Sequence, residues 1–206
     1  MNELMETNVK HFTGRYDALD RWLSYWYQSE LVRLTEAQEV IEIGCGNKTV
    51  SNLLKRNGIK VLTVDNDPSL GPDQIGDVLT LPLPNEAART ILCAEVLEHL
   101  PFEDFPRALA ELRRVAKEFV VLSLPHWGIS FRLSFKLPLI RPIDLFLKIP
   151  WPRRHVWNGE HYWEIGKTGF PVRRIRKEIT KAGFRIEFEK IYPDNPAHHY
   201  FLLKKI

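Results

Sequence analysis

Apolar side chains recur along the chain with two different periods, which predicts strands alternating with helices. In residues 15–36 they return at steps of three and four, the spacing of a helix face, so one helix or a helix pair is expected there. The β-branched run 39–43 predicts a strand, and residues 48–56 predict a helix that stops at Asn57-Gly58. Further strands are expected over 60–64, 75–81, 90–96 and 119–124, with a helix over 105–116.

The last part of the chain predicts a helix over 172–182 and then two strands, over 185–191 and 199–203. A Pro-Asp-Asn-Pro turn joins these strands, so they are expected to form a hairpin with an antiparallel final strand. Strands that alternate with helices imply a parallel sheet covered on both faces. We therefore predict an α/β fold: a Rossmann-like three-layer sandwich around a seven-stranded, mostly parallel sheet, with an antiparallel last strand and a small cap of helices and loops.

Composition supports one globular domain over residues 1–206, because 44% of the residues are hydrophobic and 27% are charged. An N-terminal helical part, 1–37, and a segment rich in proline and tryptophan, 126–165, are expected to form a cap over the substrate. Cys45 and Cys93 lie in apolar runs, which predicts buried reduced thiols. With no secretion signal at the start and no apolar run near 20 residues, a cytoplasmic location is expected.

A glycine-rich turn follows the strand over 39–43. Gly44 and Gly46 allow the backbone to approach a ligand closely, and the start of the next helix offers free N–H groups. Asp65 stands 21 residues after Gly44, at the end of the second strand, where a carboxylate can accept hydrogen bonds from both hydroxyls of a ribose. The glycines and the acid at this spacing predict a nucleotide-type cofactor.

Four segments, in order, resemble the class I S-adenosylmethionine (SAM)-dependent methyltransferases, especially the small-molecule group that includes ubiquinone-biosynthesis enzymes. They are Glu42-Ile-Gly-Cys-Gly, Val64-Asp-Asn-Asp-Pro, Gly76-Asp-Val and Cys93-Ala-Glu-Val-Leu-Glu-His-Leu. The resemblance implies that the first segment holds the methionine part of SAM, the second holds its ribose and the third meets its adenine. Lys48 stands where many members have a third glycine, and we hypothesise that it reaches the methionine carboxylate. The SAM-binding residues thus implied are Glu42, Gly44, Cys45, Gly46, Asp65, Asn66, Asp77, Val78 and Glu95.

Three histidines are candidates for a general base, since an imidazole can remove a proton near neutral pH: His99, His126 and His161. The sequence does not rank them, and structural, hydrogen-bonded histidines are an equally good interpretation. Glu95, Glu98 and His99, with His161, also have ligand types suited to Mg²⁺, Mn²⁺ or Zn²⁺. That segment resembles the metal-binding segment of small-RNA 2′-O-methyltransferases and of some ubiquinone O-methyltransferases. Because many methyltransferases without a metal carry a similar segment, no metal is expected.

The partner expected is a small-molecule methyl acceptor, and the aromatic residues of the cap suit an apolar, aromatic, glycan or lipid molecule. In 129–154 apolar and basic residues alternate, and such a stretch can rest weakly on a membrane surface. A net charge of +3 is small for a nucleic-acid binder, which disfavours such a partner. We predict a SAM-dependent methyltransferase (EC 2.1.1.-). Alternatives are a metal-assisted RNA or quinone O-methyltransferase and a non-catalytic SAM-binding regulatory module; the oligomeric state is not indicated.

Overall fold

The computed structural model describes residues 18–136, 138, 141, 143–149, 151, 153–157 and 159–206. What the sequence predicts for residues 1–17, including the lack of a secretion signal, lies outside the described residues. No helix in the described part is long and apolar enough to cross a membrane.

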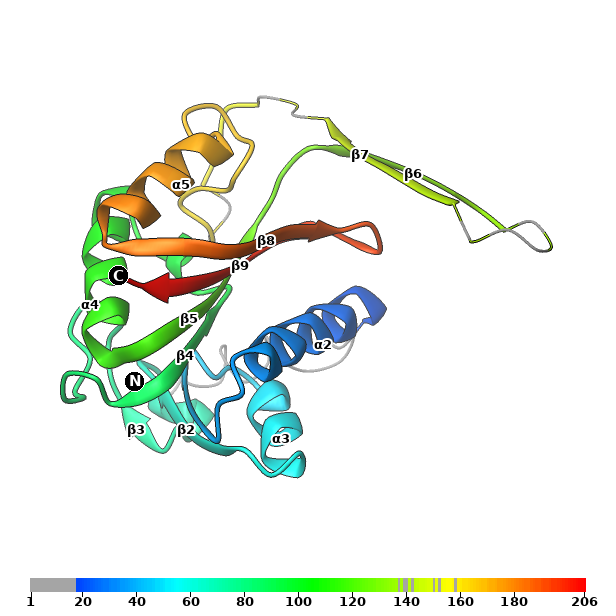
Figure 1. Cartoon of the computed structure of the whole chain (residues 1–206). Coiled ribbons are helices and arrows are strands. Elements are labelled where there is room, and N and C mark those ends of the chain that lie inside the picture. Colours follow the sequence, from blue (N-terminus) through cyan, green and yellow to red (C-terminus); the bar gives the residue numbers. More distant parts are fainter. Residues whose placement is uncertain are drawn as a thin grey trace.

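Seven strands form one sheet in the order β3-β2-β1-β4-β5-β9-β8 (Figure 1). β9 runs antiparallel to both of its neighbours, whereas the other pairs in the sheet are parallel. The prediction of a mostly parallel sheet with an antiparallel last strand is therefore confirmed. The strands are β1 (Glu39–Ile43), β2 (Lys60–Asp65), β3 (Gln74–Ile75), β4 (Ala88–Ala94), β5 (Ala116–Pro125), β8 (Phe184–Tyr192) and β9 (Asn195–Lys205).

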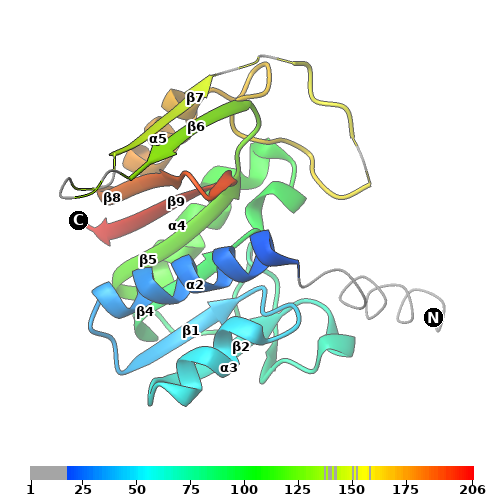
Figure 2. The same ribbon diagram turned by 90° about the vertical axis from the view of Figure 1, so that its right-hand side faces the viewer.

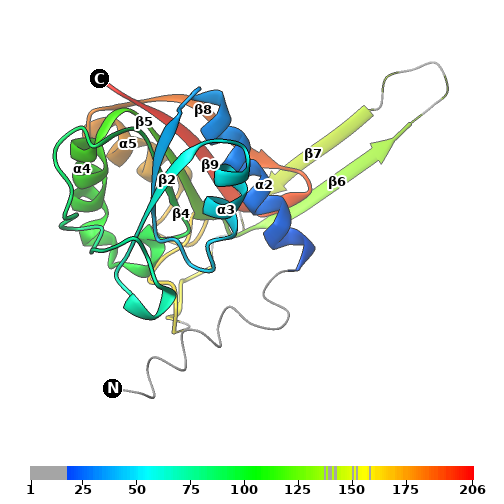
Figure 3. The same cartoon turned by 90° about the horizontal axis from the view of Figure 1, so that it is seen from below.

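Helices cover both faces of this sheet, which gives the predicted three layers (Figures 1 and 3). α2 (Leu19–Leu34) and α3 (Thr49–Arg56) pack on one face, and α4 (Phe105–Val115) and α5 (Val172–Lys181) pack on the other. Successive residues of a strand point to opposite faces, so Ile91 of β4 joins the α4–α5 core while Leu92 joins the α2–α3 core. The central strands are thus buried on both sides.

The predicted third strand over 75–81 is wrong, because β3 ends at Ile75. A tight turn follows, in which the Asp77 side chain accepts a hydrogen bond from the backbone N–H of Leu79 at 2.8 Å. A Cβ at Gly76 would lie 2.5 Å from Cδ of Pro82, so the turn packs tightly on itself. Asp77, which forms the turn, and the nearby Pro82 therefore end the strand, although the residues that follow are largely apolar.

The segment 126–165 differs from the expected cap of helices and loops. It includes β6 (Ile129–Phe135) and β7 (Ile143–Ile149), an antiparallel two-stranded ribbon that extends away from the main sheet (Figures 1 and 2). The alternation of apolar and polar residues in this stretch has the period of a strand. After the ribbon the chain returns to the domain, where Trp163 is fully buried against Phe102 and Phe105.

Candidate functional site

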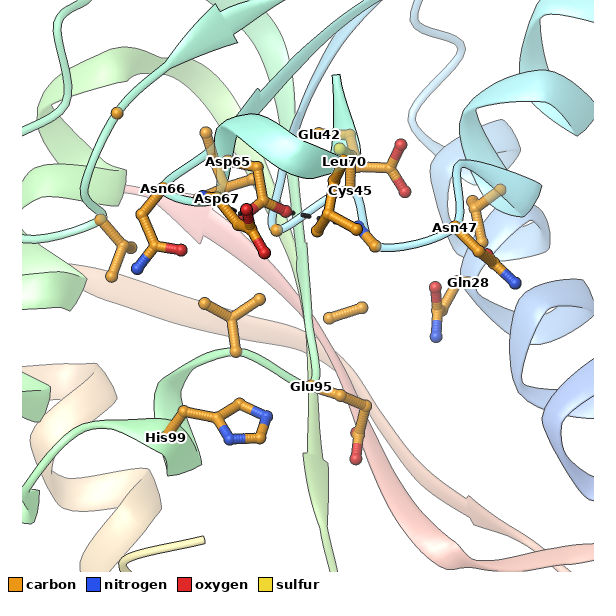
Figure 4. A pocket seen from close by; sticks show the side chains of 18 of the residues that line it. Gln28, Glu42, Cys45, Asn47, Asp65, Asn66, Asp67, Leu70, Glu95 and His99 are labelled. Carbon is orange, nitrogen blue, oxygen red and sulfur yellow. Dashed lines mark hydrogen bonds between the residues drawn. The ribbon is translucent and has the colours of Figure 1, made fainter. Parts of the chain in front are cut away.

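A pocket of about 600 Å³ lies at the carboxyl ends of β1, β2 and β4, where the order of strands reverses around β1 (Figure 4). Ligands of open α/β sheets bind at such a switch point. The walls come from the loops after these strands, the turn at 76–78, one face of α2 and residues 159–160. The pocket lining includes all nine residues predicted to bind the cofactor: Glu42, Gly44, Cys45, Gly46, Asp65, Asn66, Asp77, Val78 and Glu95.

The glycine loop is held against two neighbouring strands. Gly44 has a φ of 77°, and its N–H donates to the carbonyl of Val64 at 2.8 Å. A Cβ at Gly44 would lie 2.2 Å from Cγ2 of Val96, so the residue after β1 must be glycine for the loop after β4 to pack beside it. The Asp65 carboxylate accepts hydrogen bonds from the N–H groups of Gly46 at 3.4 Å and Asp67 at 3.1 Å, which orients it beside the loop.

Glu42 is a buried carboxyl group at the floor of the pocket. Burial raises its pKa to about 8, and hydrogen bonding with Ser51 and the charge of Lys55 offset only part of that rise. Among the described residues its Oε2 atom has no hydrogen-bond partner. A carboxyl group in this state is neutral at pH 7, and a cation bound beside it would favour its ionised form.

The lining is strongly acidic. It contains six carboxylates and, among its described Lys and Arg residues, a single cation, Arg21. Such a site attracts a positively charged ligand. α2 brings three further residues into the pocket wall that were not predicted from the sequence: Arg21, Tyr25 and Gln28. Their spacing of four and three residues places them on one helix face, and that was the signal in the sequence.

The hypothesis that Lys48 reaches the pocket is wrong. Its ammonium group donates to the carbonyl of Gly71, outside the pocket lining. Lys48 has a φ of 60°, the left-handed conformation that glycine adopts most readily. Lys48 is the N-cap of α3, and the side-chain oxygen of Asn47, the residue before it, accepts from the N–H of Thr49 at 3.1 Å.

Of the three candidate bases, only His99 belongs to the pocket lining. Its Nδ1 atom lies 2.9 Å from the carbonyl oxygen of Glu160. Since a carbonyl can only accept, Nδ1 carries the proton and Nε2 of the neutral ring is an acceptor. Burial lowers the pKa of His99, which keeps the ring neutral. The position, tautomer and neutrality of His99 all suit a general base.

His126 lies elsewhere, stacked on His199 with their Nδ1 atoms 3.0 Å apart. Burial, and then the neighbouring His199 and Lys148, lower the pKa of His126 to about 3, so it is a weak base. His199 continues the network with a contact of 2.8 Å to Glu189, which also binds Arg176. The structure therefore gives His126 a place in a buried polar network outside the pocket lining.

His161 lies behind His99, with the two ring centroids 5.1 Å apart. Its Nε2 atom is 4.0 Å from the carboxylate of Glu98. Glu98 is fully buried, and neither of its oxygens has a hydrogen-bond partner among the described residues. Burial and the nearby Glu95 raise its pKa well above the ordinary value.

Three of the four residues with metal-ligand chemistry thus converge. One ligand atom from each of Glu98, His99 and His161 lies within 4.8 Å of the others. Glu95 is outside this group, because its carboxylate accepts from the hydroxyl of Ser123 at 2.8 Å. The unpartnered oxygens of Glu98 fit a cation held with the two imidazoles, so the donor set is compatible with a metal. The expectation that no metal is needed stays a prediction.

A family model described as "Methyltransferase domain" matches residues 41–122. Among curated proteins, none matches the sequence. Solved structures are similar over nearly the whole chain. 1,6-Didemethyltoxoflavin-N1-methyltransferase from Burkholderia thailandensis, with S-adenosylhomocysteine bound, is 14% identical with a TM-score of 0.64 and covers 98% of this chain and 87% of its own.

Two further structures have the same fold. Magnesium protoporphyrin IX methyltransferase from Synechocystis PCC 6803, also with S-adenosylhomocysteine bound, is 14% identical with a TM-score of 0.57, covering 98% of this chain and 100% of its own. A SAM-dependent methyltransferase from Clostridium acetobutylicum is 10% identical with a TM-score of 0.62, and the match covers 100% of this chain and 99% of the other. At these identities the neighbours show the fold alone. They confirm the predicted Rossmann-like fold, and the family model shows that residues 41–122 are similar to a methyltransferase domain. The closer resemblance to ubiquinone-biosynthesis enzymes stays a prediction.

Proposed function

We propose that the protein transfers a methyl group from SAM to a small-molecule acceptor, in class EC 2.1.1.-, because residues 41–122 match a family model described as a methyltransferase domain. The observation that carries this proposal is the acidic pocket at the switch point, with the unpartnered carboxyl oxygen of Glu42 at its floor. SAM supplies an activated sulfonium methyl group, so the protein has to bind it, align the acceptor and exclude water.

The pocket residues match the parts of SAM chemically. SAM carries an ammonium and a sulfonium, and the lining has six carboxylates to balance them. We assign Asp65 to the ribose hydroxyls and Asp77 to the adenine amine, because a carboxylate accepts from such donors. Glu42 supports the positive end of the methionine part, while Arg21, the only described Lys or Arg in the lining, pairs with its carboxylate.

The acceptor is assigned to the opposite side of the pocket. Figure 4 shows His99 and Glu95 across from Asp65 and Cys45, so the cavity separates a donor side from an acceptor side. The Nε2 atom of His99 can take the proton of an acceptor O–H or N–H as the methyl group is transferred, and S-adenosylhomocysteine leaves. The hydrogen bond from Nδ1 of His99 to the carbonyl of Glu160 holds the ring in the required tautomer.

The convergence of Glu98, His99 and His161 favours one further candidate, metal-assisted methyl transfer to an oxygen atom. In that case His99 and His161 would hold a divalent cation with Glu98, and the cation would lower the pKa of an acceptor hydroxyl. The two candidates differ in one measurement. Metal-assisted transfer is lost after exhaustive chelation and restored by Mg²⁺, Mn²⁺ or Zn²⁺, whereas transfer with His99 as the base survives chelation.

Calorimetry with SAM and S-adenosylhomocysteine tests the donor assignment. Asp65→Ala should weaken SAM binding about 100-fold, since two charge-assisted hydrogen bonds are worth roughly 3 kcal/mol together. Asp104→Ala is the matched control. Asp104 is the N-cap residue of α4 and does not line the pocket, so this variant should bind SAM like the wild type. If the wild-type protein binds neither ligand, or if Asp65→Ala binds as tightly as Asp104→Ala, the assignment is wrong.

Turnover separates an enzyme from a SAM-binding regulatory module. The assay follows S-adenosylhomocysteine release while a panel of apolar, aromatic, glycan and lipid acceptors is offered. His99→Gln should leave SAM binding intact and reduce the rate about 100-fold or more for an O–H or N–H acceptor. A protein that binds SAM but releases no product with any acceptor of the panel supports the regulatory module.

A further inference from the structure

The ribbon formed by β6 and β7 divides its side chains into two chemically different faces. In an antiparallel ribbon, directly paired residues and alternate residues lie on the same face. The register pairs apolar residues four times on one face: Ile129 with Ile149, Phe131 with Leu147, Leu133 with Leu145 and Phe135 with Ile143. The opposite face carries the remaining pairs: Ser130 with Lys148, Arg132 with Phe146 and Ser134 with Asp144.

The polar face is turned toward the domain. Lys148 donates from its ammonium group to the carbonyls of Pro196 at 2.7 Å and His126 at 3.1 Å. The pKa of Arg132 is raised mainly by its hydrogen bond to Asp144 and further by Asp194, which lies in the turn between β8 and β9. The eight-residue apolar face therefore points away from the domain.

That apolar face is open to solvent. Seven of its eight side chains are between 39% and 59% exposed, which is an unusually large contiguous apolar surface for a domain of this size. An isolated two-stranded ribbon is at best marginally stable in water, so a face of this kind indicates a partner. Figures 1 and 3 show the ribbon projecting beyond the helices of the domain.

Charge identifies the kind of partner. Residues 126–157 contain six Lys and Arg against one Asp, while the rest of the chain has 23 basic and 25 acidic residues. Lys136 and Arg141 lie at the tip of the ribbon and Arg153 and Arg154 beyond its base, and all four are exposed. None of these four is paired with a carboxylate among the described residues. The positive charge of the protein is thus concentrated around its exposed apolar face.

We propose that this face of the ribbon docks on a membrane surface that contains anionic lipids. The apolar side chains enter the boundary between headgroups and acyl chains, and the basic side chains meet lipid phosphates. Trp151 and Trp157, both more than half exposed beyond the base of the ribbon, suit the headgroup level. The edges of the ribbon have open backbone groups, so it lies flat in the interface, where water and headgroups satisfy them.

Charge also argues against a second copy of the chain as the occupant. Two ribbons packed with their apolar faces together would bring two sets of four exposed basic residues close to each other. Like charges so arranged oppose association, whereas anionic lipids neutralise them. The proposal is independent of methyl transfer, because none of the described residues of the ribbon lines the proposed SAM pocket.

The test measures binding of the full chain to vesicles by co-sedimentation. Phosphatidylcholine vesicles with phosphatidylglycerol should bind the protein, pure phosphatidylcholine vesicles should bind it much more weakly, and added salt should release it. Phe131→Ser together with Leu147→Ser should lower the partition coefficient roughly tenfold or more, since one apolar pair is lost. Phe146→Ser, the same kind of change on the opposite face, is the matched control and should bind like the wild type.

Several outcomes would overturn the proposal. It fails if anionic vesicles do not bind the protein, or if the double variant and Phe146→Ser bind them equally. It also fails if light scattering shows a dimer that the double variant converts to a monomer, because the face would then belong to a second copy. Thermal unfolding of each variant, with and without SAM, checks that the domain is intact and separates loss of docking from loss of fold.

Discussion

The buried carboxyl group of Glu42 makes SAM binding depend on pH. With a pKa of about 8 in the free protein, about nine in ten molecules have a neutral Glu42 at pH 7. If the ionised form is the one that stabilises the positively charged ligand, binding must first remove that proton. The cost at pH 7 is about 1.4 kcal/mol, or a factor of about ten in affinity, and it rises by the same amount for each pH unit below 7.

Glu42→Gln is the perturbation that isolates this effect, because glutamine keeps the size of the side chain and does not titrate. For the wild type, the SAM association constant should rise about tenfold per pH unit toward pH 8 and then level off. The variant should lack this slope. The ligand has an α-amino group that also titrates near pH 8, but it does so with both proteins, so the difference between the two curves reports Glu42.

Calorimetry in buffers with different ionisation enthalpies measures the protons directly. The wild type should release close to one proton per SAM at pH 7, and Glu42→Gln should release fewer. The stability of the free protein should also depend on pH. Since the pKa of Glu42 in the folded state is raised above the ordinary value of 4.5, its neutral form stabilises the fold below pH 4.5, and this stability is lost as the pH rises toward 8. Equal proton release and equal pH slopes in the two proteins would refute the reasoning.

Two other substitutions test how neighbouring residues stabilise the fold around the pocket. Burial works against ionisation of Glu189, yet hydrogen bonds from the neighbouring imidazole and guanidinium hold its pKa at about 2. Because this pKa is lowered, ionised Glu189 stabilises the fold above its ordinary pKa of 4.5, and that stability is lost as the pH falls toward 2. Glu189→Gln should reduce the acid-induced loss in free energy of unfolding, measured by urea titration, by about 3 kcal/mol. An equal loss in the variant and the wild type would contradict this prediction. Gly44→Ala should lower stability by about 2 kcal/mol and abolish SAM binding, because its Cβ would overlap Val96. Adding Val96→Ala should restore part of the lost stability. If it restores none, the overlap with Val96 is not the cause of the loss.

Much of the donor side of the pocket could be predicted from sequence because its residues lie at the ends of strands. Parallel strands end at one edge of a sheet, so Gly44 and Asp65 meet there once the strands are recognised. Asp77 was found by resemblance although the strand predicted around it is wrong. Its place depends on a turn, which a local apolar pattern does not distinguish from a strand end.

The parts of the pocket that tertiary packing brings together could not be predicted to the same depth. Arg21 and Tyr25 enter the pocket only because α2 lies on one face of the sheet, and Glu160 arrives from a segment beyond the ribbon. His99 and His126 are equivalent in sequence terms, since each follows a strand. Burial and neighbours separate them, and those depend on the whole fold.

The segment between β5 and α5 joins the two activities proposed for this protein. It leaves β5 at its carboxyl end, forms the ribbon, and returns to place Gly159 and Glu160 in the pocket wall. The return is anchored where Ile165 pairs with Pro125 and Trp127 through backbone hydrogen bonds of 3.0 and 2.8 Å. The carbonyl that orients His99 therefore belongs to the same segment as the apolar face.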